Sequence, residues 1–259
     1  MSAIVITSCN KKYFNFLERL YLSLRISNPN TSMHCRFVVN NEEEKKYLSL
    51  KCKDFKVFTY DFFEFYKADI LVPKHPNSKK INEMFFRKTG SIANCLKHLM
   101  VLEFLDSYEH VLQVDTDNII IKDIDSFLRN KVFDILCVYQ NIDKNTLKNF
   151  VKVKNNIYTE TIFKEFFTNN IDSTFNLIKE GCYFVRSNFA LKNELKKMKT
   201  AFMPYVIEGS VGGGTPALML IEGYKNTNVV NDNKLVSYKL EYDCLSVSGF
   251  LDNKYKIKI

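Results

Sequence analysis

Hydrophobic and polar positions in the first quarter of the chain alternate between two periods. Short continuous apolar runs are typical of buried strands, whereas apolar residues three and four apart mark one face of a helix. Tyr13, Leu17, Leu20 and Leu24 have the helical spacing, and Pro29 ends that segment. The runs predict strands at residues 3–7, 35–39 and 55–59, with a second, polar-faced helix at 42–50. Strand, helix, strand, helix, strand is the order of a nucleotide-binding half-domain, although no GxGxxG motif is present.

The pattern of the remainder of the chain predicts three helices, at about 91–106, 188–203 and 215–223, and a series of further strands. Ser91 is a suitable N-cap for a helix to Asp106, whose apolar side would carry Ile92, Cys95, Leu96, Leu99 and Leu102. We expect an aromatic-rich turn through Phe62, Phe63, Phe65 and Tyr66, a loop at residues 73–78, and a variable region at 139–176. Further strands are expected at 110–114, 133–138, 181–185, 229–230 and 235–240. Without a repeat or linker, residues 1–259 are predicted to form a single α/β domain.

Composition narrows the class of protein. The chain has 37 Lys and Arg against 29 Asp and Glu, a formal net charge of +8, and this moderate excess suits an anionic partner. Only six of the basic residues are Arg and they are scattered, which argues against sequence-reading nucleic-acid binding. The seven Cys include no CxxC pair and are expected to be free thiols in a reducing cytoplasm. No apolar stretch approaches the length of a transmembrane helix.

The most informative chemistry lies at the end of the strand predicted at 110–114. Asp115 and Asp117 follow it directly, and two residues apart in extended chain they would face the same side. Paired carboxylates at the carboxyl end of an α/β strand suit Mn²⁺ or Mg²⁺ bound together with a diphosphate. The bare pattern is common, and Asp123 with Asp125 forms a second example. The alternative is a solvated turn in which an Asp acts as a cap.

The segment from Arg87 to Leu128, centred on VLQVDTDNIIIKDIDSFL, resembles the DxD region of GT-A-fold glycosyltransferases, most nearly the galactosyltransferase and glycogenin-type group. The resemblance implies a GT-A fold with a Rossmann-like mixed central sheet flanked by helices. It divides the domain into a nucleotide-sugar-binding half, 1–120, and an acceptor-binding half, 121–259. It also implies that Asp115 reaches ribose and metal and that Asp117 ligates the metal, with Thr116 between them at the donor. Lys97 or His98 would contact the donor sugar or phosphates, with Arg87 and Lys88 as neighbouring candidates.

Two further segments resemble the same family. Its first strand leads into a polar turn that holds base and ribose, a place taken here by Thr7, Ser8, Asn10 and Tyr13. The segment FNLIKEGCYFVRSN resembles the strand that closes the sugar pocket, which implies pocket roles for Glu180 and Gly181. Gly214 and Thr215, ahead of a predicted helix, would either cradle a phosphate or form a flexible acceptor loop.

Three positions depart from the family pattern. Ser8 and Cys9 replace the usual acid of the first turn, and Gly213-Gly214 replaces an acidic pair near the acceptor. The carboxy-terminal His that serves relatives as third metal ligand is absent, and Asp243 or Asp252 would have to substitute. These departures make a catalytically silent nucleotide-sugar or glycan binding domain one alternative.

The function predicted from the sequence is metal-dependent transfer of a sugar from a nucleotide sugar, with UDP expected, to a hydroxyl on a glycan, lipid or protein. Resemblance to retaining relatives suggests front-face attack without a protein base, whereas an inverting route would use Glu180 or Glu208 as base. A sugar-phosphate nucleotidyltransferase is a further alternative, but residues 7–12 lack the Gly-rich loop expected of that class.

Overall fold

The computed structural model describes residues 2–39, 41–52, 59–64, 97, 100–101, 103–143, 174–187, 228–237 and 243–247. Helical elements in these ranges are the short 3-10 turn η1 (Lys11–Tyr13), α1 (Phe14–Ser27), α2 (Glu42–Cys52) and α5 (Ile124–Leu128). The strands are β1 (Ala3–Asn10), β2 (Ser32–Val39), β3 (Thr59–Glu64), β4 (His110–Val114), β5 (Ile119–Ile120), β6 (Ile135–Asp143), β7 (Thr174–Arg186), β8 (Val229–Asn231), β9 (Val236–Ser237) and β10 (Ser246–Val247).

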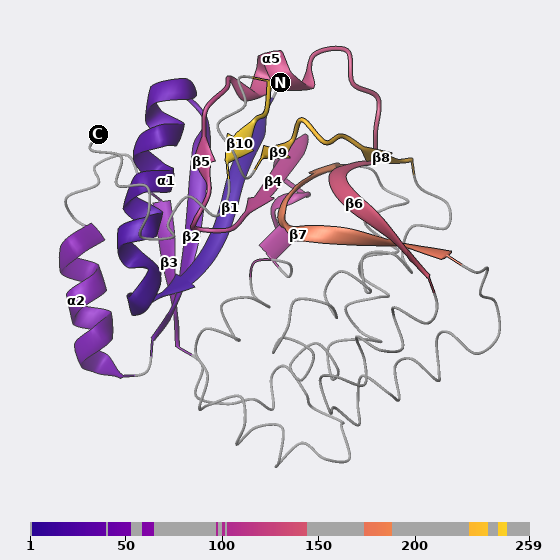
Figure 1. The fold of residues 1–259 in the computed structure, drawn as a ribbon. Coiled ribbons are helices and arrows are strands. Elements are labelled where there is room, and N and C mark those ends of the chain that lie inside the picture. Colours follow the sequence, from indigo (N-terminus) through magenta and orange to yellow (C-terminus); the bar gives the residue numbers. More distant parts are fainter. Residues whose placement is uncertain are drawn as a thin grey trace.

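A central mixed sheet organises the described part of the chain. Seven strands lie in the order β3-β2-β1-β4-β7-β6-β8 (Figure 1). The first four are parallel, β7 is antiparallel to both β4 and β6, and β8 is parallel to β6. The sequence prediction of a mixed sheet with parallel early strands is therefore confirmed. Because β1 and β4 are parallel neighbours, their carboxyl ends open at the same edge of the sheet, where ligands of α/β proteins bind.

A smaller sheet of three strands, in the order β5-β10-β9, follows the acidic residues after β4. Polar side chains at the end of α1 hydrogen-bond to β5, the first strand of this sheet, and to the residues that follow it. Ser23 Oγ accepts the Ile120 N–H at 3.0 Å and Ser27 Oγ donates to the Ile120 carbonyl at 3.2 Å. Asn28, the α1 C-cap, accepts the Ile124 N–H at 2.6 Å and donates to the Lys122 carbonyl at 3.0 Å. The chain that leaves β4 is thus fixed to α1 through residue 124.

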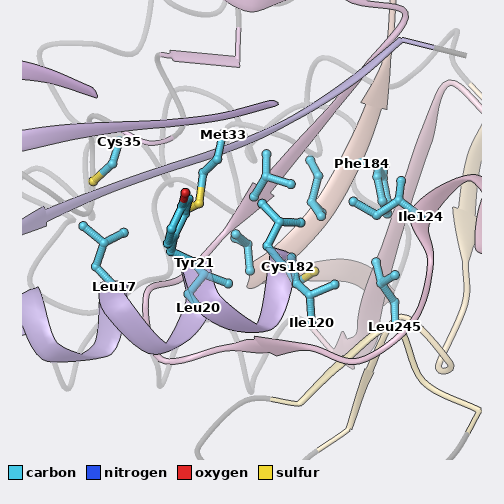
Figure 2. Close-up of a cluster of buried hydrophobic side chains, with 14 of the residues drawn as sticks. Leu17, Leu20, Tyr21, Met33, Cys35, Ile120, Ile124, Cys182, Phe184 and Leu245 are labelled. Carbon is cyan, nitrogen blue, oxygen red and sulfur yellow. The ribbon is translucent and has the colours of Figure 1, made fainter. Parts of the chain in front are cut away.

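The hydrophobic core fills the space between α1 and the sheet. Figure 2 shows Leu17, Leu20 and Tyr21 of α1 on the same side as Met33 and Cys35 of β2, all of them buried. Burying a side chain of this size stabilises the fold by roughly 1.5–3 kcal/mol. The same cluster extends to the later segments through Ile120, Ile124, Cys182, Phe184 and Leu245. One core therefore joins the amino-terminal strands to the segments on both sides of the acidic turn.

Two expectations for the amino-terminal half need correction. Of the third strand expected at 55–59, only residue 59 lies among the described residues, as the first residue of β3 (Thr59–Glu64), and residues 62 and 63 of the expected aromatic turn lie in that strand. The physical reason is that aromatic residues favour strands, and β3 pairs in parallel with His34–Val39. Tyr13 lies in η1 ahead of α1 and is 38% exposed, because Phe14 begins the buried face instead.

Later elements also differ from the prediction. β7 begins at Thr174, not at residue 181, and its added length pairs antiparallel with the end of β6. The end of β6 and the start of β7 fall in the segment expected to be variable. Their polar composition gives no strand signal, and they pair with each other across a long separation in sequence. α5 was not predicted, and Asp123 is its N-cap, accepting the Ser126 N–H at 2.7 Å. The second Asp pair thus contains a helix cap.

Helical residues at 97, 100–101 and 103–104 confirm a helix before β4. Lys97, Met100 and Val101 are buried there, whereas the apolar positions expected at 92, 95, 96, 99 and 102 lie outside the described residues. None of the described helices is long and apolar enough to cross a membrane. The cysteines whose side chains the structure describes are buried free thiols, as expected: Cys9, Cys35, Cys137, Cys182 and Cys244.

Candidate active site

The two acids after β4 lie in a tight turn. The Asn118 N–H donates to the Asp115 carbonyl at 3.1 Å, which closes the segment Asp115–Asn118. The sequence prediction assumed an extended chain here, and the turn corrects it. Thr116 is buried within the turn, whereas Asp115 and Asp117 are partly exposed. The turn keeps the two carboxylates near one another at the carboxyl end of a fully buried strand.

The pKa of Asp117 reflects its burial and its nearness to Asp115. Burial raises the pKa of the Asp117 carboxyl above its ordinary value, and the neighbouring negative charge of Asp115 raises it further. The positive charge of Lys97 and a hydrogen bond from Asn118 oppose the rise in pKa. Negative charge is therefore concentrated at this turn, where a bound cation would lower its electrostatic cost.

Lys97 supplies the positive charge next to the turn. Its ammonium forms an ion pair with Asp115 Oδ1, and its side chain is only 4% exposed, against 34% for Asp115. The sequence analysis placed Lys97 at the donor. The structure brings it to the acid that the resemblance assigns to ribose and metal. A buried ammonium beside two carboxylates is a suitable neighbour for a phosphate group.

Backbone and amide contacts fix the turn from its other side. The Asp115 N–H donates to the Gly181 carbonyl at 2.8 Å, so β7 holds the start of the turn. A Cβ added at Gly181 would lie 3.4 Å from Asp115 Oδ2, within ordinary contact distance. Asn118 Nδ2 donates to the Asp115 carbonyl at 3.2 Å and to Asp117 Oδ1 at 3.3 Å. Gly181, which the sequence analysis assigned to the sugar pocket, therefore lies next to Asp115.

The residues expected to hold base and ribose lie in the second half of β1, next to β4 in the sheet, and in η1, which follows it. Thr7 is fully buried, and its hydroxyl has no hydrogen-bond partner within the described part of the chain. Ser8 is also buried. Asn10 caps η1 by accepting the Lys12 N–H at 3.1 Å. Tyr13, in η1, is the most exposed of the four.

Several expected site residues fall outside the described residues: Arg87, Lys88, His98, Glu208, Gly214, Thr215 and Asp252. Glu180 lies in β7 directly before Gly181, and its backbone alone is described. Asp243, a candidate third metal ligand, has a side chain that is 78% exposed and pairs with Lys122 at 3.4 Å. Among the described residues, no group of three or more His, Cys, Asp or Glu side chains could hold a metal.

Sequence reasoning missed two residues at this site, Asn118 and Ser246. Asn118 stands between Asp117 and the apolar run at 119–121, and this polar position directly after the acids was an available signal. Ser246 lies 128 positions later in the chain, and its hydroxyl donates to Asn118 Oδ1 at 3.3 Å. Nothing in the local sequence of Ser246 points to the acidic turn.

Comparison with known proteins identifies the architecture. No family model matches the chain, and no curated protein matches it by sequence. Among solved structures, the chain is similar to an active-site mutant of LgtC, with a TM-score of 0.51 and 11% identity, over 95% of this chain and 86% of that one. The chain has the GT-A fold. At this identity the likeness concerns the fold alone.

Two other GT-A structures are similar at lower scores. The bifunctional glycosyltransferase WbbM gives a TM-score of 0.49 at 11% identity, over 96% of this chain and 45% of that one. Mouse xyloside xylosyltransferase 1 gives 0.48 at 10% identity, over 98% and 99% of the two chains. The chain spans about half the length of WbbM and 58% of GlyE from Streptococcus pneumoniae TIGR4.

Proposed function

We propose that this GT-A protein is a metal-dependent glycosyltransferase that moves a sugar from a nucleotide sugar, with UDP expected, to a hydroxyl of a glycan, lipid or protein. One observation carries the proposal. At the carboxyl end of β4, a single turn presents Asp115 and Asp117 beside the buried ammonium of Lys97. Two carboxylates and one ammonium group at a ligand-binding edge of the sheet suit a metal-bound diphosphate.

The donor set fits a hard divalent cation. Asp115 and Asp117 offer carboxylate oxygens, and the pKa of Asp117 is raised first by burial and then by the negative charge of Asp115, which a cation would offset. These two residues would hold Mn²⁺ or Mg²⁺. When bound, such an ion supplies Lewis-acid stabilisation of a departing diphosphate.

The protein's own residues supply positioning and charge. Lys97 holds Asp115 in the unliganded protein and places a positive charge where the negative charge of the leaving group develops. Thr7, Ser8 and Asn10 lie in β1, the strand next to β4, and Tyr13 follows in η1; we propose that these residues bind base and ribose. The acceptor hydroxyl would attack the anomeric carbon as the bond from that carbon to the diphosphate oxygen breaks. Its proton would leave with the diphosphate on a retaining route or pass to Glu180 or Glu208 on an inverting one.

A transfer assay tests the proposal. The full chain is incubated with a panel of UDP- and GDP-sugars, Mn²⁺ and acceptors of the three classes, and nucleoside diphosphate release is measured. We expect release with one donor, its loss on chelation, and its loss in Asp117→Asn. The control is Glu42→Gln, which removes an exposed carboxylate paired with Lys45 in α2 and should leave release unchanged.

The outcome of the panel also separates the alternatives. Normal turnover by Asp117→Asn would refute the assignment of the acidic turn. UDP binding without transfer or hydrolysis across the panel would instead indicate a catalytically silent binding domain. Formation of a nucleotide sugar from a sugar phosphate and a nucleoside triphosphate would indicate a nucleotidyltransferase.

A further inference from the structure

Asn118 is the most enclosed polar side chain of the acidic turn. It is 1% exposed, and its amide nitrogen faces three oxygen atoms. These are the Asp115 carbonyl at 3.2 Å, Asp117 Oδ1 at 3.3 Å and the Gly181 carbonyl at 3.4 Å. A group surrounded by acceptors must be a donor, so the amide orientation is fixed by its surroundings. One side chain thus joins the turn, the Asp117 carboxylate and β7.

Ser246 holds the other end of the same amide. Its hydroxyl is fully buried in β10 and lies 3.3 Å from Asn118 Oδ1. The Leu235 carbonyl at 3.3 Å and Cys182 Sγ at 3.6 Å are its other neighbours. Because an amide oxygen accepts and cannot donate, the hydroxyl must donate to Asn118 when this contact forms. The last described strand is therefore connected to Asp117 through one intervening side chain.

We infer that Asn118 is a positioning residue that aims the Asp117 carboxylate at the metal of the nucleotide sugar, and that Ser246 sets the orientation of the Asn118 amide. This inference rests on the proposed function. Its physical basis is that a carboxylate with fixed direction binds a cation without first losing rotational freedom. Both ends of the Asn118 amide contact groups of the protein, so Asn118 would act through Asp117 and the turn.

The test measures Mn²⁺ affinity by the electron paramagnetic resonance signal of free Mn²⁺, using the full chain with saturating UDP. Loss of an outer-shell partner typically weakens metal binding 10- to 100-fold, and we expect a change of about that size in Asn118→Ala. Ser246→Ala should weaken it by about 3-fold or more, because the amide remains but is less constrained. Urea unfolding of each variant shows that the compared proteins are folded.

Ser23→Ala is the matched control. Ser23 is likewise a buried hydroxyl, and it accepts the Ile120 N–H two residues after Asn118, but it does not contact the amide. We expect its Mn²⁺ affinity to equal that of the unmodified chain. An equal loss in Ser23→Ala and Ser246→Ala would mean that general loosening explains the effect, and the inference would be wrong.

The remaining outcomes are distinguishable. If the unmodified chain binds no Mn²⁺ with UDP, the proposed function fails and the inference fails with it. If the unmodified chain binds Mn²⁺ and Asn118→Ala binds it equally well, the inference alone is overturned. If Asn118→Ala does not fold, Ser246→Ala decides, and an affinity unchanged in that variant overturns the inference.

Discussion

The ion pair between Lys97 and Asp115 has partners that differ in exposure, and this difference predicts an unequal response to mutation. The Lys97 side chain is 4% exposed and that of Asp115 is 34% exposed. Asp115→Asn leaves a buried ammonium without its carboxylate, a change that costs about 3–5 kcal/mol in buried pairs. Because Asp117 retains a negative charge nearby, we expect the lower end, about 3 kcal/mol. Lys97→Met leaves a carboxylate that water reaches, and we expect a loss of about 1 kcal/mol.

The double variant completes the cycle. With both charges replaced by neutral side chains of similar size, neither group is left unpaired, and the free energy of unfolding should lie within about 1 kcal/mol of the unmodified protein. The expected coupling is then about 4 kcal/mol, measured by urea unfolding with equal m-values. Lys122 and Asp243 provide a control pair of the same residue types, 36% and 78% exposed, with an expected coupling below about 1 kcal/mol. Additive effects at Lys97 and Asp115, or a larger loss in Lys97→Met, would refute the reasoning.

Three further predictions concern other groups. Asp117→Asn should raise the urea midpoint at pH 7, because ionised Asp117 with its raised pKa destabilises the native state. The midpoints of the variant and the unmodified protein should converge as the pH falls below about 3.9, the pKa of an Asp carboxyl in the unfolded chain, and equal midpoints at pH 7 would contradict this prediction. Asn28→Ala should cost about 2–4 kcal/mol in urea unfolding, since the Ile124 N–H and Lys122 carbonyl lose their partner; a loss below 1 kcal/mol would show that water replaces it. Burial raises the pKa of the Cys137 and Cys182 thiols to about 12, so iodoacetamide at pH 8 should label them only after unfolding, as mass spectrometry of their peptides would report.

The amino-terminal architecture could be predicted from sequence because its signals are local. Apolar runs identified β1, β2 and β4, and helical spacing identified α1. Where neighbouring signals conflicted, the prediction failed. Aromatic residues after residue 59 were interpreted as a turn, although their strand propensity and pairing with β2 place them in β3. The full length of β7 depends on pairing with β6, which no local pattern records.

The sequence predicted the acidic residues of the candidate site but not the residues that hold them in place by hydrogen bonds. Asp115 and Asp117 stand out because they follow an apolar strand, and Lys97 was named through a family resemblance. The turn itself depends on Gly181, Asn118 and Ser246, and these contacts are backbone or amide hydrogen bonds between distant segments. Such bonds place few demands on the identity of surrounding residues. Sequence patterns therefore reveal the charged groups more readily than the groups that aim them.

The acidic turn is held by segments that come together only in the folded chain. Lys97 precedes β4, Gly181 belongs to β7, and Ser246 lies in β10, yet each is one or two contacts from the Asp115–Asn118 turn. Close carboxylates repel each other, so a turn without these partners would separate them or bind protons. Holding them together costs stability in the unliganded protein and leaves them arranged for a cation. Burial of Asp117 and the nearby charge of Asp115 both raise the pKa of Asp117, and the same placement of the two carboxylates would suit the proposed metal.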